Sequence, residues 1–200
     1  MTPDEVTPLL FCCFSILFLA SVAINLILVP LFISQNRKLK TTRDRLSLLS
    51  ASALEDMRLQ WLTELPHHTY RNELEIEVKF IYPMLRFLGY TANDLQVRVS
   101  VPIQVGRQTQ TPAADWVVLR NGKPFLAIEA KKHNQELSDE VLAQARSYAY
   151  GLNLNLYVVT NGRTLEVYSR GNENDSRVLR VPINEIDSHW HNLKQLIGKQ

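Results

Sequence analysis

Three charged side chains stand in the middle of the chain, in segments that are otherwise apolar. Asp115 begins the run Asp115-Trp-Val-Val118, while Glu129 and Lys131 end the run Leu126-Ala-Ile-Glu-Ala-Lys131. Because side chains alternate between the two faces of a strand, Glu129 and Lys131 project to the same face. Two carboxylates and an ammonium at one edge of a sheet are suited to holding a divalent metal and orienting a water against a phosphate.

The metal predicted for this site is Mg²⁺, with Mn²⁺ as the alternative, because carboxylate and carbonyl oxygens suit both ions. Asp115 and Glu129 are its predicted ligands, together with the backbone carbonyl of Ala130. Such a metal lowers the pKa of a bound water and stabilises charge on the attacked phosphate. Lys131 would orient that water or stabilise the transition state.

Each of these residues also has a purely structural interpretation. Asp115 fits a turn cap, and Glu129 with Lys131 fits a surface ion pair worth under about 1 kcal/mol. However, Glu129 lies inside an apolar run that is typical of a central strand. A lone buried carboxylate is costly unless it is paired or binds metal, and this favours the metal site.

Further polar positions fall on two predicted helices. One helix covers 72–88, with Pro83 offsetting its last turns, and Glu77 lies at the boundary of its buried face. The other runs from Ser138 or Asp139 to about Tyr150, and on it Gln144 and Tyr148 share one face because they are four residues apart. The apolar stripe predicted for the first helix consists of Leu74, Val78, Ile81, Leu85 and Leu88.

The overall charge excludes a strongly basic nucleic-acid scavenger. The chain has 22 Lys and Arg against 20 Asp and Glu, a formal net charge of +2. Any contact with nucleic acid must therefore come from a local patch. The predicted phosphate contacts, which give affinity without sequence specificity, are Lys79, Arg98, Lys132 and Arg146.

Five phrases follow one another along the chain. They are Glu77-Val-Lys-Phe-Ile-Tyr-Pro-Met-Leu-Arg-Phe-Leu-Gly-Tyr90, the run at Asp115, Leu126-Ala-Ile-Glu-Ala-Lys-Lys132, Gln144-xxx-Tyr148 and Val158-Val-Thr-Asn-Gly-Arg-Thr-Leu-Glu-Val-Tyr168. In this order they resemble the PD-(D/E)xK nuclease superfamily, and in particular the N-terminal nuclease domain of type I restriction enzyme R subunits. The resemblance covers roughly residues 70–170, and it departs from the family pattern in that no proline directly precedes Asp115.

The resemblance implies roles for residues that spacing alone does not assign. Asp115, Glu129 and Lys131 become catalytic, with Glu77 supporting the metal directly or through water. Gln144 and Tyr148 position the DNA backbone or the active-site lysine. The implied activity is a Mg²⁺-dependent (endo)deoxyribonuclease, and a homodimer is one arrangement that supplies two sites for cutting both strands.

The predicted fold is α/β, a restriction-endonuclease-like mixed sheet flanked by helices. Asn121-Gly122 is a strong hairpin turn, and 183–197 is predicted to be a terminal helix. Strands are predicted at 97–103, 116–119, 124–130, 156–160, 165–168 and 178–181. No Walker-type phosphate loop is present, so no ATPase motor is predicted in this chain, and His189-Trp190-His191 is interpreted as surface.

The sequence also predicts one N-terminal transmembrane helix over 8–34. These residues are uncharged and mostly apolar, and they exceed the ~20 needed to cross the hydrocarbon. Asp4 and Glu5 at the start fit poorly with a cleaved signal peptide. The five basic residues between 37 and 45 place the following chain in the cytoplasm and the N-terminus outside, as a single-pass protein of the plasma (inner) membrane.

A helical stalk or linker over 35–66 and a nuclease-like domain over 67–200 complete the predicted organisation. A helix packed on the domain is an equally good interpretation of the stalk, and too few heptads are present for a coiled coil. Cys12 and Cys13 are interpreted as apolar filler, with palmitoylation as the alternative. For function, the alternatives to a DNA nuclease are an inactive module of the same fold that binds nucleic acid or protein at the membrane, and a nuclease that acts on RNA.

Overall fold

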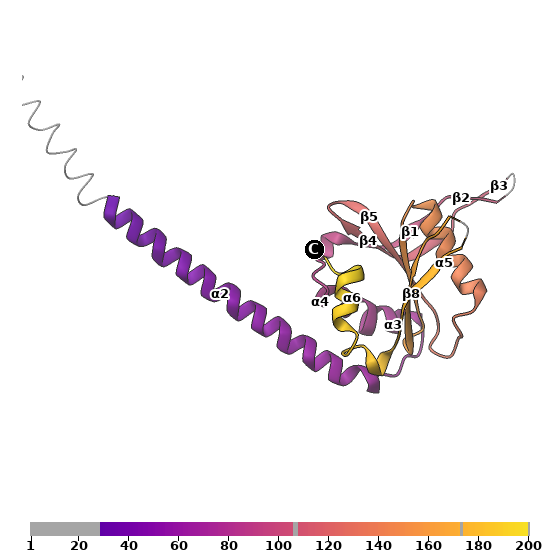
Figure 1. The fold of residues 1–200 in the computed structure, drawn as a ribbon, viewed down its shortest axis with the longest axis horizontal. Helices are drawn as coiled ribbons and strands as arrows, with labels where there is room; N and C mark the ends of the chain where they lie inside the picture. Colours follow the sequence, from indigo (N-terminus) through magenta and orange to yellow (C-terminus); the bar gives the residue numbers. More distant parts are fainter. Residues whose placement is uncertain (1–28, 106–107, 173, 200) are drawn as a thin grey trace, which may run out of the picture. The chain divides into compact units, whose positions relative to one another are not determined.

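The computed structural model of the protein describes residues 29–105, 108–172 and 174–199 (Figure 1). The chain divides between Leu54 and Glu55 into two compact units. Helix α2 spans Val29–Glu64 and runs through this division. Most of the stalk predicted over 35–66 thus lies in this helix. The second unit, residues 55–200, is called the folded unit below and includes the last turns of α2.

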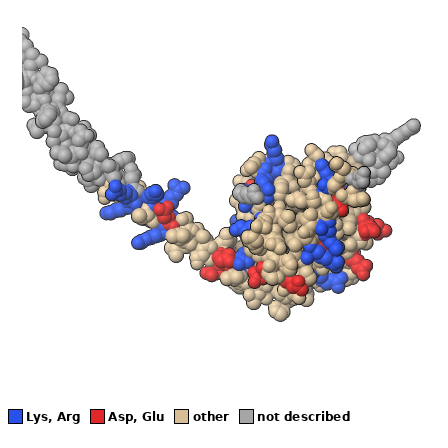
Figure 2. Space-filling view, viewed as in Figure 1, with Lys and Arg blue, Asp and Glu red and all other residues tan. Residues whose placement is uncertain are grey.

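The predicted membrane span lies mostly outside the described residues, which begin at 29. Within the described part of the chain, no helix combines the length and the apolar character that a membrane crossing requires. Lys and Arg side chains gather along the first part of α2, and on the visible face of the folded unit both signs of charge are interspersed (Figure 2). The basic group on α2 consists of Arg37, Lys38, Lys40, Arg43 and Arg45, all exposed.

A mixed six-stranded sheet forms the centre of the folded unit, in the order β1-β4-β5-β6-β7-β8. Only β5 and β6 are parallel among these neighbours, and α5, spanning Asp139–Gly151, makes the crossover between them. The strands are β1 Leu95–Ser100, β4 Ala113–Arg120, β5 Lys123–Ala130, β6 Leu156–Thr160, β7 Thr164–Ser169 and β8 Ser176–Pro182. The predicted α/β class and mixed sheet are thus confirmed.

Helices cover both faces of this sheet (Figure 1). On one face α5 buries Val141, Ala145 and Tyr148 against the strands. The other face carries the larger core, to which α6, spanning Trp190–Ile197, and the segment 73–88 contribute. The terminal helix is shorter than predicted, because residues 183–185 form a separate 3-10 turn, η6 Ile183–Glu185.

The segment 73–88 is a helix with a change of pitch. It consists of α3 Glu73–Ile76, a π turn η4 Glu77–Ile81 and α4 Tyr82–Phe87. Ile81, Leu85 and Leu88 are buried as predicted, but Leu74 and Val78 are 59% and 58% exposed. The π turn shifts the phase of the buried face, so Ile76 and Phe80 are buried in their place.

Pro83 explains how the end of α2 docks on this segment. Proline has no N–H to donate to the carbonyl four residues earlier, which is that of Lys79. The indole Nε1–H of Trp61 donates to this Lys79 carbonyl at 3.1 Å. Trp61, Leu62 and Leu65 are all buried in the larger core, so the last turns of α2 are part of the folded unit.

Turns and breaks shape the strands near the site. Asn121 and Gly122 both have positive φ, 53° and 74°, as the predicted tight hairpin turn between β4 and β5 requires. The single strand predicted over 97–103 is instead two. Strand β1 ends at Ser100, and beyond Pro102 the chain forms β2 Ile103–Val105, which pairs with β3 Gln108–Gln110 in a separate ribbon.

The C-terminal residues pack at the end of the sheet where the β4–β5 turn lies. The N–H of Lys199 donates to the Leu88 carbonyl at 2.9 Å, and its ammonium lies 2.6 Å from the carboxylate of Asp94. Arg120, at the end of β4, donates to the Gly198 carbonyl at 2.8 Å. Lys199 is therefore held at the end of the sheet that is opposite to the C-terminal end of β5.

Candidate active site

The charged residues predicted from the sequence meet where β4 begins and β5 ends. Main-chain pairing of these antiparallel strands reaches Trp116 and Ile128. One residue further on, a carboxylate oxygen of Asp115 accepts a hydrogen bond of 2.8 Å from the backbone N–H of Ala130. The Asp115 side chain thus continues the contact between β4 and β5 beyond their last main-chain pair. It contacts Ala130, the residue that follows Glu129.

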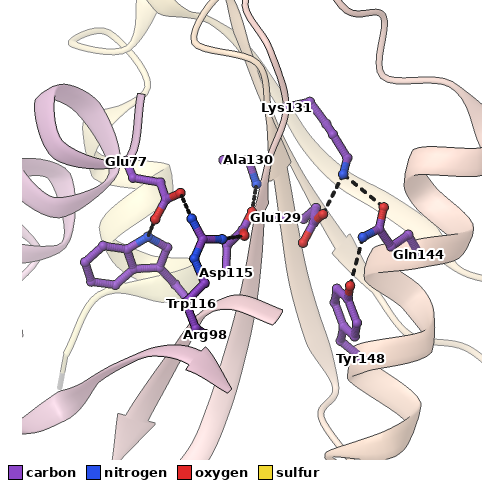
Figure 3. Close-up of polar contacts among 9 residues, drawn as sticks. All are labelled: Glu77, Arg98, Asp115, Trp116, Glu129, Ala130, Lys131, Gln144 and Tyr148. Carbon is purple, nitrogen blue, oxygen red and sulfur yellow. Dashed lines mark hydrogen bonds and ion pairs between the residues drawn. The ribbon is translucent and has the colours of Figure 1, made fainter. Parts of the chain in front are cut away.

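On the face covered by α5, four of the predicted residues form one chain of contacts (Figure 3). The ammonium of Lys131 lies 2.6 Å from Glu129 Oε1 and 2.9 Å from Gln144 Oε1. The amide of Gln144 in turn donates to the Tyr148 hydroxyl at 2.8 Å. The predicted common face of Glu129 and Lys131 and that of Gln144 and Tyr148 are both confirmed.

Glu129 has one carboxylate oxygen without a partner. The residue is 3% exposed, and its Oε2 is buried with no hydrogen bond from any described residue. Burial raises the pKa of the Glu129 carboxyl above its usual value, and the nearby charge of Glu73 adds to this, while Lys131 acts in the opposite direction. Burial likewise raises the pKa of the Tyr148 hydroxyl.

Arg98 links the two remaining acids of the site. One guanidinium nitrogen lies against Asp115 Oδ1 and the other 2.6 Å from Glu77 Oε1 (Figure 3). The second oxygen of Glu77 accepts from the indole Nε1–H of Trp116 at 2.9 Å. Glu77 is 3% exposed, so the acid predicted at the boundary of the helix face is in fact buried.

The site therefore consists of two groups on either side of the end of β5. Glu77, Arg98 and Asp115 lie on one side, and Glu129, Lys131 and Gln144 lie on the other (Figure 3). Within the described residues, no three acidic, histidine or cysteine side chains are already arranged to hold a metal. The donor set nevertheless fits a divalent cation, because Glu129 presents an unsatisfied buried oxygen and a carbonyl follows it at Ala130.

The four predicted phosphate contacts differ in what they touch. Lys132 is exposed and has no ion pair within the described residues. Lys79 lies 3.0 Å from Glu75, on the exposed side of η4. Arg146 lies 3.0 Å from Asp175 and so joins α5 to the chain before β8. Arg98 is engaged with the two acids described above.

Two features of the site could not be identified by pattern alone. The sequence predicts Trp116 only as a strand residue, and the one signal for its role is that a buried indole N–H needs an acceptor. The sequence predicts Arg98 only as a phosphate contact, whereas its φ of 53° places it in the left-handed region that non-glycine residues rarely adopt. Nothing in the sequence indicates that conformation.

Residues 72–186 match a family model described as the type I restriction enzyme R protein N terminus (HSDR_N). No curated protein matches the chain. Among solved structures, the fragment of a putative HsdR subunit of a type I restriction enzyme from Vibrio vulnificus YJ016 is 22% identical with a TM-score of 0.42, over 60% of this chain and 25% of that one.

Two further structures are similar over part of their length. A cryo-EM structure of a DrdV–DNA complex is 14% identical with a TM-score of 0.50, over 70% of this chain and 14% of that one. The type IIG restriction endonuclease BpuSI is 18% identical with a TM-score of 0.30, over 49% of this chain and 12% of that one. The chain thus spans a quarter or less of each of these proteins, and what it shares with the DrdV structure is the fold.

Proposed function

Because the chain belongs to the family of type I restriction enzyme R protein N-terminal domains, we propose that it is a metal-dependent nuclease that hydrolyses phosphodiester bonds of DNA. Restriction of incoming DNA, or another defence role, is the biological setting that we propose for it. The observation that carries the proposal is the contact chain from Glu129 through Lys131 to Gln144, at the end of β5.

Asp115, Glu129 and the carbonyl of Ala130 are the residues that would hold Mg²⁺ or Mn²⁺. Asp115 and Ala130 are already joined by a hydrogen bond, and Glu129 has a free buried oxygen. When bound there, the cation supplies a Lewis acid for the phosphate and lowers the pKa of a coordinated water. Glu77 supports the site from the helix side through Arg98 and Trp116.

The ammonium of Lys131 lies next to the place where the attacked phosphate would lie. Its side chain is 13% exposed and is fixed by two acceptors, Glu129 and Gln144. A cation held in a fixed position stabilises negative charge that develops in the transition state without reorganising. Tyr148 positions Lys131 through Gln144, because its hydroxyl accepts the Gln144 amide.

The proposal is tested by incubating the purified full chain with supercoiled plasmid and Mg²⁺. The matched variants are Asp115→Asn and Lys131→Met, with Lys123→Met as the control. Lys123 is exposed at the other end of β5, and its replacement removes the same charge as Lys131→Met. We expect cleavage by the wild type and by the control only. Equal cleavage by all four proteins, or cleavage by none, contradicts the proposal.

RNA is the alternative substrate of the same site. Cleavage of plasmid in the presence of excess unlabelled RNA or excess unlabelled DNA distinguishes the two, because the preferred polymer inhibits more strongly. Stronger inhibition by RNA would assign the site to RNA hydrolysis.

One observation favours a second candidate, an inactive module of the same fold that binds nucleic acid or protein. All four carboxylate oxygens of Glu77 and Asp115 are satisfied by protein groups of Arg98, Trp116 and Ala130. Such a module needs no cation. Calorimetric titration with Mg²⁺ distinguishes the candidates, since heat of binding that disappears in Asp115→Asn belongs to the nuclease.

The location that we propose is the cytoplasmic face of the plasma membrane, with residues 8–34 as a single-pass anchor. The support is the uncharged run in the sequence and the exposed basic residues that follow it on α2. Membrane fractionation with protease protection tests this. A protein that washes off membranes at high salt, or whose residues 55–200 are digested by protease added to intact spheroplasts, contradicts it.

A further inference from the structure

The side chain of Arg98 occupies a position between two buried acids. It projects from β1, where main-chain pairs with β4 are formed on either side of it by Val97 and Val99. Its guanidinium contacts Asp115 Oδ1 and Glu77 Oε1, the latter at 2.6 Å (Figure 3). The left-handed backbone at Arg98 is unfavourable for a residue with a side chain.

The two acids depend on Arg98 for their charge balance. Their side chains are 4% and 11% exposed, and buried carboxylates require a counter-charge. Arg98 is the one cation paired with either of them within the described residues. In the part of the chain that the structure describes, their other oxygens accept from neutral donors, the Trp116 indole and the Ala130 amide.

Arg98 is nevertheless accessible enough to be displaced from the two acids. Its side chain is 53% exposed, in contrast to the acids that it joins. Because a guanidinium keeps its charge at all accessible pH values, it cannot be neutralised in place. It can only be displaced as a cation, by another cation that takes over the acids or by an anion that attracts it outwards.

Asp115 Oδ1, which Arg98 contacts, is the oxygen that a divalent cation would approach if it replaced the guanidinium. The second oxygen of Asp115 already accepts from the Ala130 N–H, which ties it to the strand. We propose that Arg98 is an internal counter-cation that competes with Mg²⁺ for Asp115 and that moves to a DNA phosphate when it is displaced. The inference rests on the proposed function and assigns Arg98 a specific part in it.

The chemistry of the guanidinium favours phosphate as the second partner. Arginine binds phosphate oxygens through two parallel N–H donors, and the half-exposed Arg98 lies at the same sheet edge as the proposed site of cleavage. Binding of DNA would then free Asp115 for the metal, and binding of the metal would free Arg98 for DNA. By linkage, each partner strengthens the other by the same factor.

Calorimetric titration of the full chain with Mg²⁺ tests the competition without relying on activity. The variants are Arg98→Met, which keeps the length of the side chain and removes its charge, and Arg98→Lys, which keeps the charge but cannot bridge two acids as a fork. Lys123→Met is the control for the change in net charge. We expect Arg98→Met to bind Mg²⁺ about 5- to 150-fold more tightly than the wild type, the usual range of such couplings, with Arg98→Lys between them.

A thermal melt provides the second readout. Metal-free Arg98→Met should melt at a lower temperature than the wild type, because its acids are left without a counter-charge, and Mg²⁺ should raise its melting temperature more than that of the wild type. If Arg98→Met proves too unstable to titrate, Arg98→Lys must still bind Mg²⁺ more tightly than the wild type.

The linkage with DNA is measured in the Lys131→Met background, where the duplex stays intact. Mg²⁺ should tighten DNA binding there, and the additional Arg98→Met change should remove this effect. Binding of Mg²⁺ that depends on Asp115 but is unchanged or weakened in both Arg98 variants overturns the inference and leaves the proposed function standing. No binding of Mg²⁺ by any variant overturns both.

Discussion

The backbone N–H of Ala130 and the carboxylate of Asp115 are joined by a hydrogen bond of 2.8 Å. This contact fixes the first acid of the site to the strand that carries the other acid and the lysine. It also separates two consequences of mutating Asp115, because the carboxylate is both a hydrogen-bond acceptor and a charge.

Asp115→Ala should destabilise the fold more than Asp115→Asn. The alanine leaves the buried N–H of Ala130 without an acceptor, which costs about 1–3 kcal/mol, whereas the asparagine oxygen can still accept from it. Both variants should lose Mg²⁺ binding. Urea unfolding of the two variants side by side checks the difference, and equal stabilities would show that the Ala130 contact contributes nothing.

Tyr148→Phe should reduce the rate of cleavage by about 2- to 13-fold, which corresponds to one neutral hydrogen bond of about 0.5–1.5 kcal/mol. The reason is that Tyr148 acts only through Gln144, whose amide donates to its hydroxyl at 2.8 Å. The loss should appear in kcat with KM unchanged. Tyr150→Phe, on the exposed side of the same helix, serves as control, and a loss of more than about 100-fold in Tyr148→Phe would indicate a direct part in the reaction instead.

Gly162→Ala should destabilise the protein by more than Gly122→Ala. Both glycines have a φ near +73°, so each substitution carries a similar backbone strain of roughly 1–2 kcal/mol. A Cβ at Gly162 would also lie 2.9 Å from the ring of Tyr70, while a Cβ at Gly122 meets open space. Overpacking of this kind adds about 1–3 kcal/mol. Guanidinium unfolding of both variants measures the difference, and equal losses would show that Tyr70 moves aside freely.

Trp61→Ala should cost about 3–5 kcal/mol of unfolding free energy, the usual range for removing a buried aromatic ring. The residue is 7% exposed, its ring packs against those of Phe80 and Trp190, and its indole N–H donates to the Lys79 carbonyl. Leu59→Ala on the same helix, where the side chain is 46% exposed, should cost much less. A small effect of Trp61→Ala would place the start of the folded unit after residue 66 rather than at Glu55.

Asp94→Asn should destabilise the protein at neutral pH and have a diminishing effect in acid. The ammonium of Lys199 and the Thr91 hydroxyl and N–H lower the pKa of Asp94 to about 2 from 3.8. A carboxyl whose pKa is lowered in the folded state stabilises it above the unfolded pKa, and this contribution is lost as the pH falls from about 3.8 to about 2. Thermal melts of both proteins at pH 7 and pH 2 check this, and a gap that stays constant with pH would exclude the ion pair as its cause.

The parts of the site that follow from local periodicity could be predicted from the sequence. Glu129 and Lys131 share a face because strands repeat every two residues, and Gln144 and Tyr148 do because helices bring residues four apart together. The hairpin at Asn121 could be predicted for the same reason, since its conformation is set by two adjacent residues. Each of these predictions needs only a single element.

The predictions that were wrong or incomplete concern breaks in periodicity or contacts between elements. The π turn over Glu77–Ile81 displaces the buried face of its helix, so the stripe is correct at Leu85 and wrong at Leu74. Pro102 lies between β1 and β2, although apolar and polar residues alternate through both as they would in a single strand. The pairing of Arg98 with Glu77 joins residues from a helix and a strand, in a backbone conformation that the sequence does not signal.

The contacts of Lys199 bear on how the protein can be attached to a probe or a surface. Lys199 is held against Leu88 and Asp94, next to the β4–β5 turn, whereas Lys131 emerges from the opposite end of the same hairpin. A fluorophore or a surface-coupling group attached beside Lys199 would therefore lie at the end of this hairpin opposite to the candidate active site. Single-molecule recordings with the protein immobilised in this way would leave the candidate active site facing the solution.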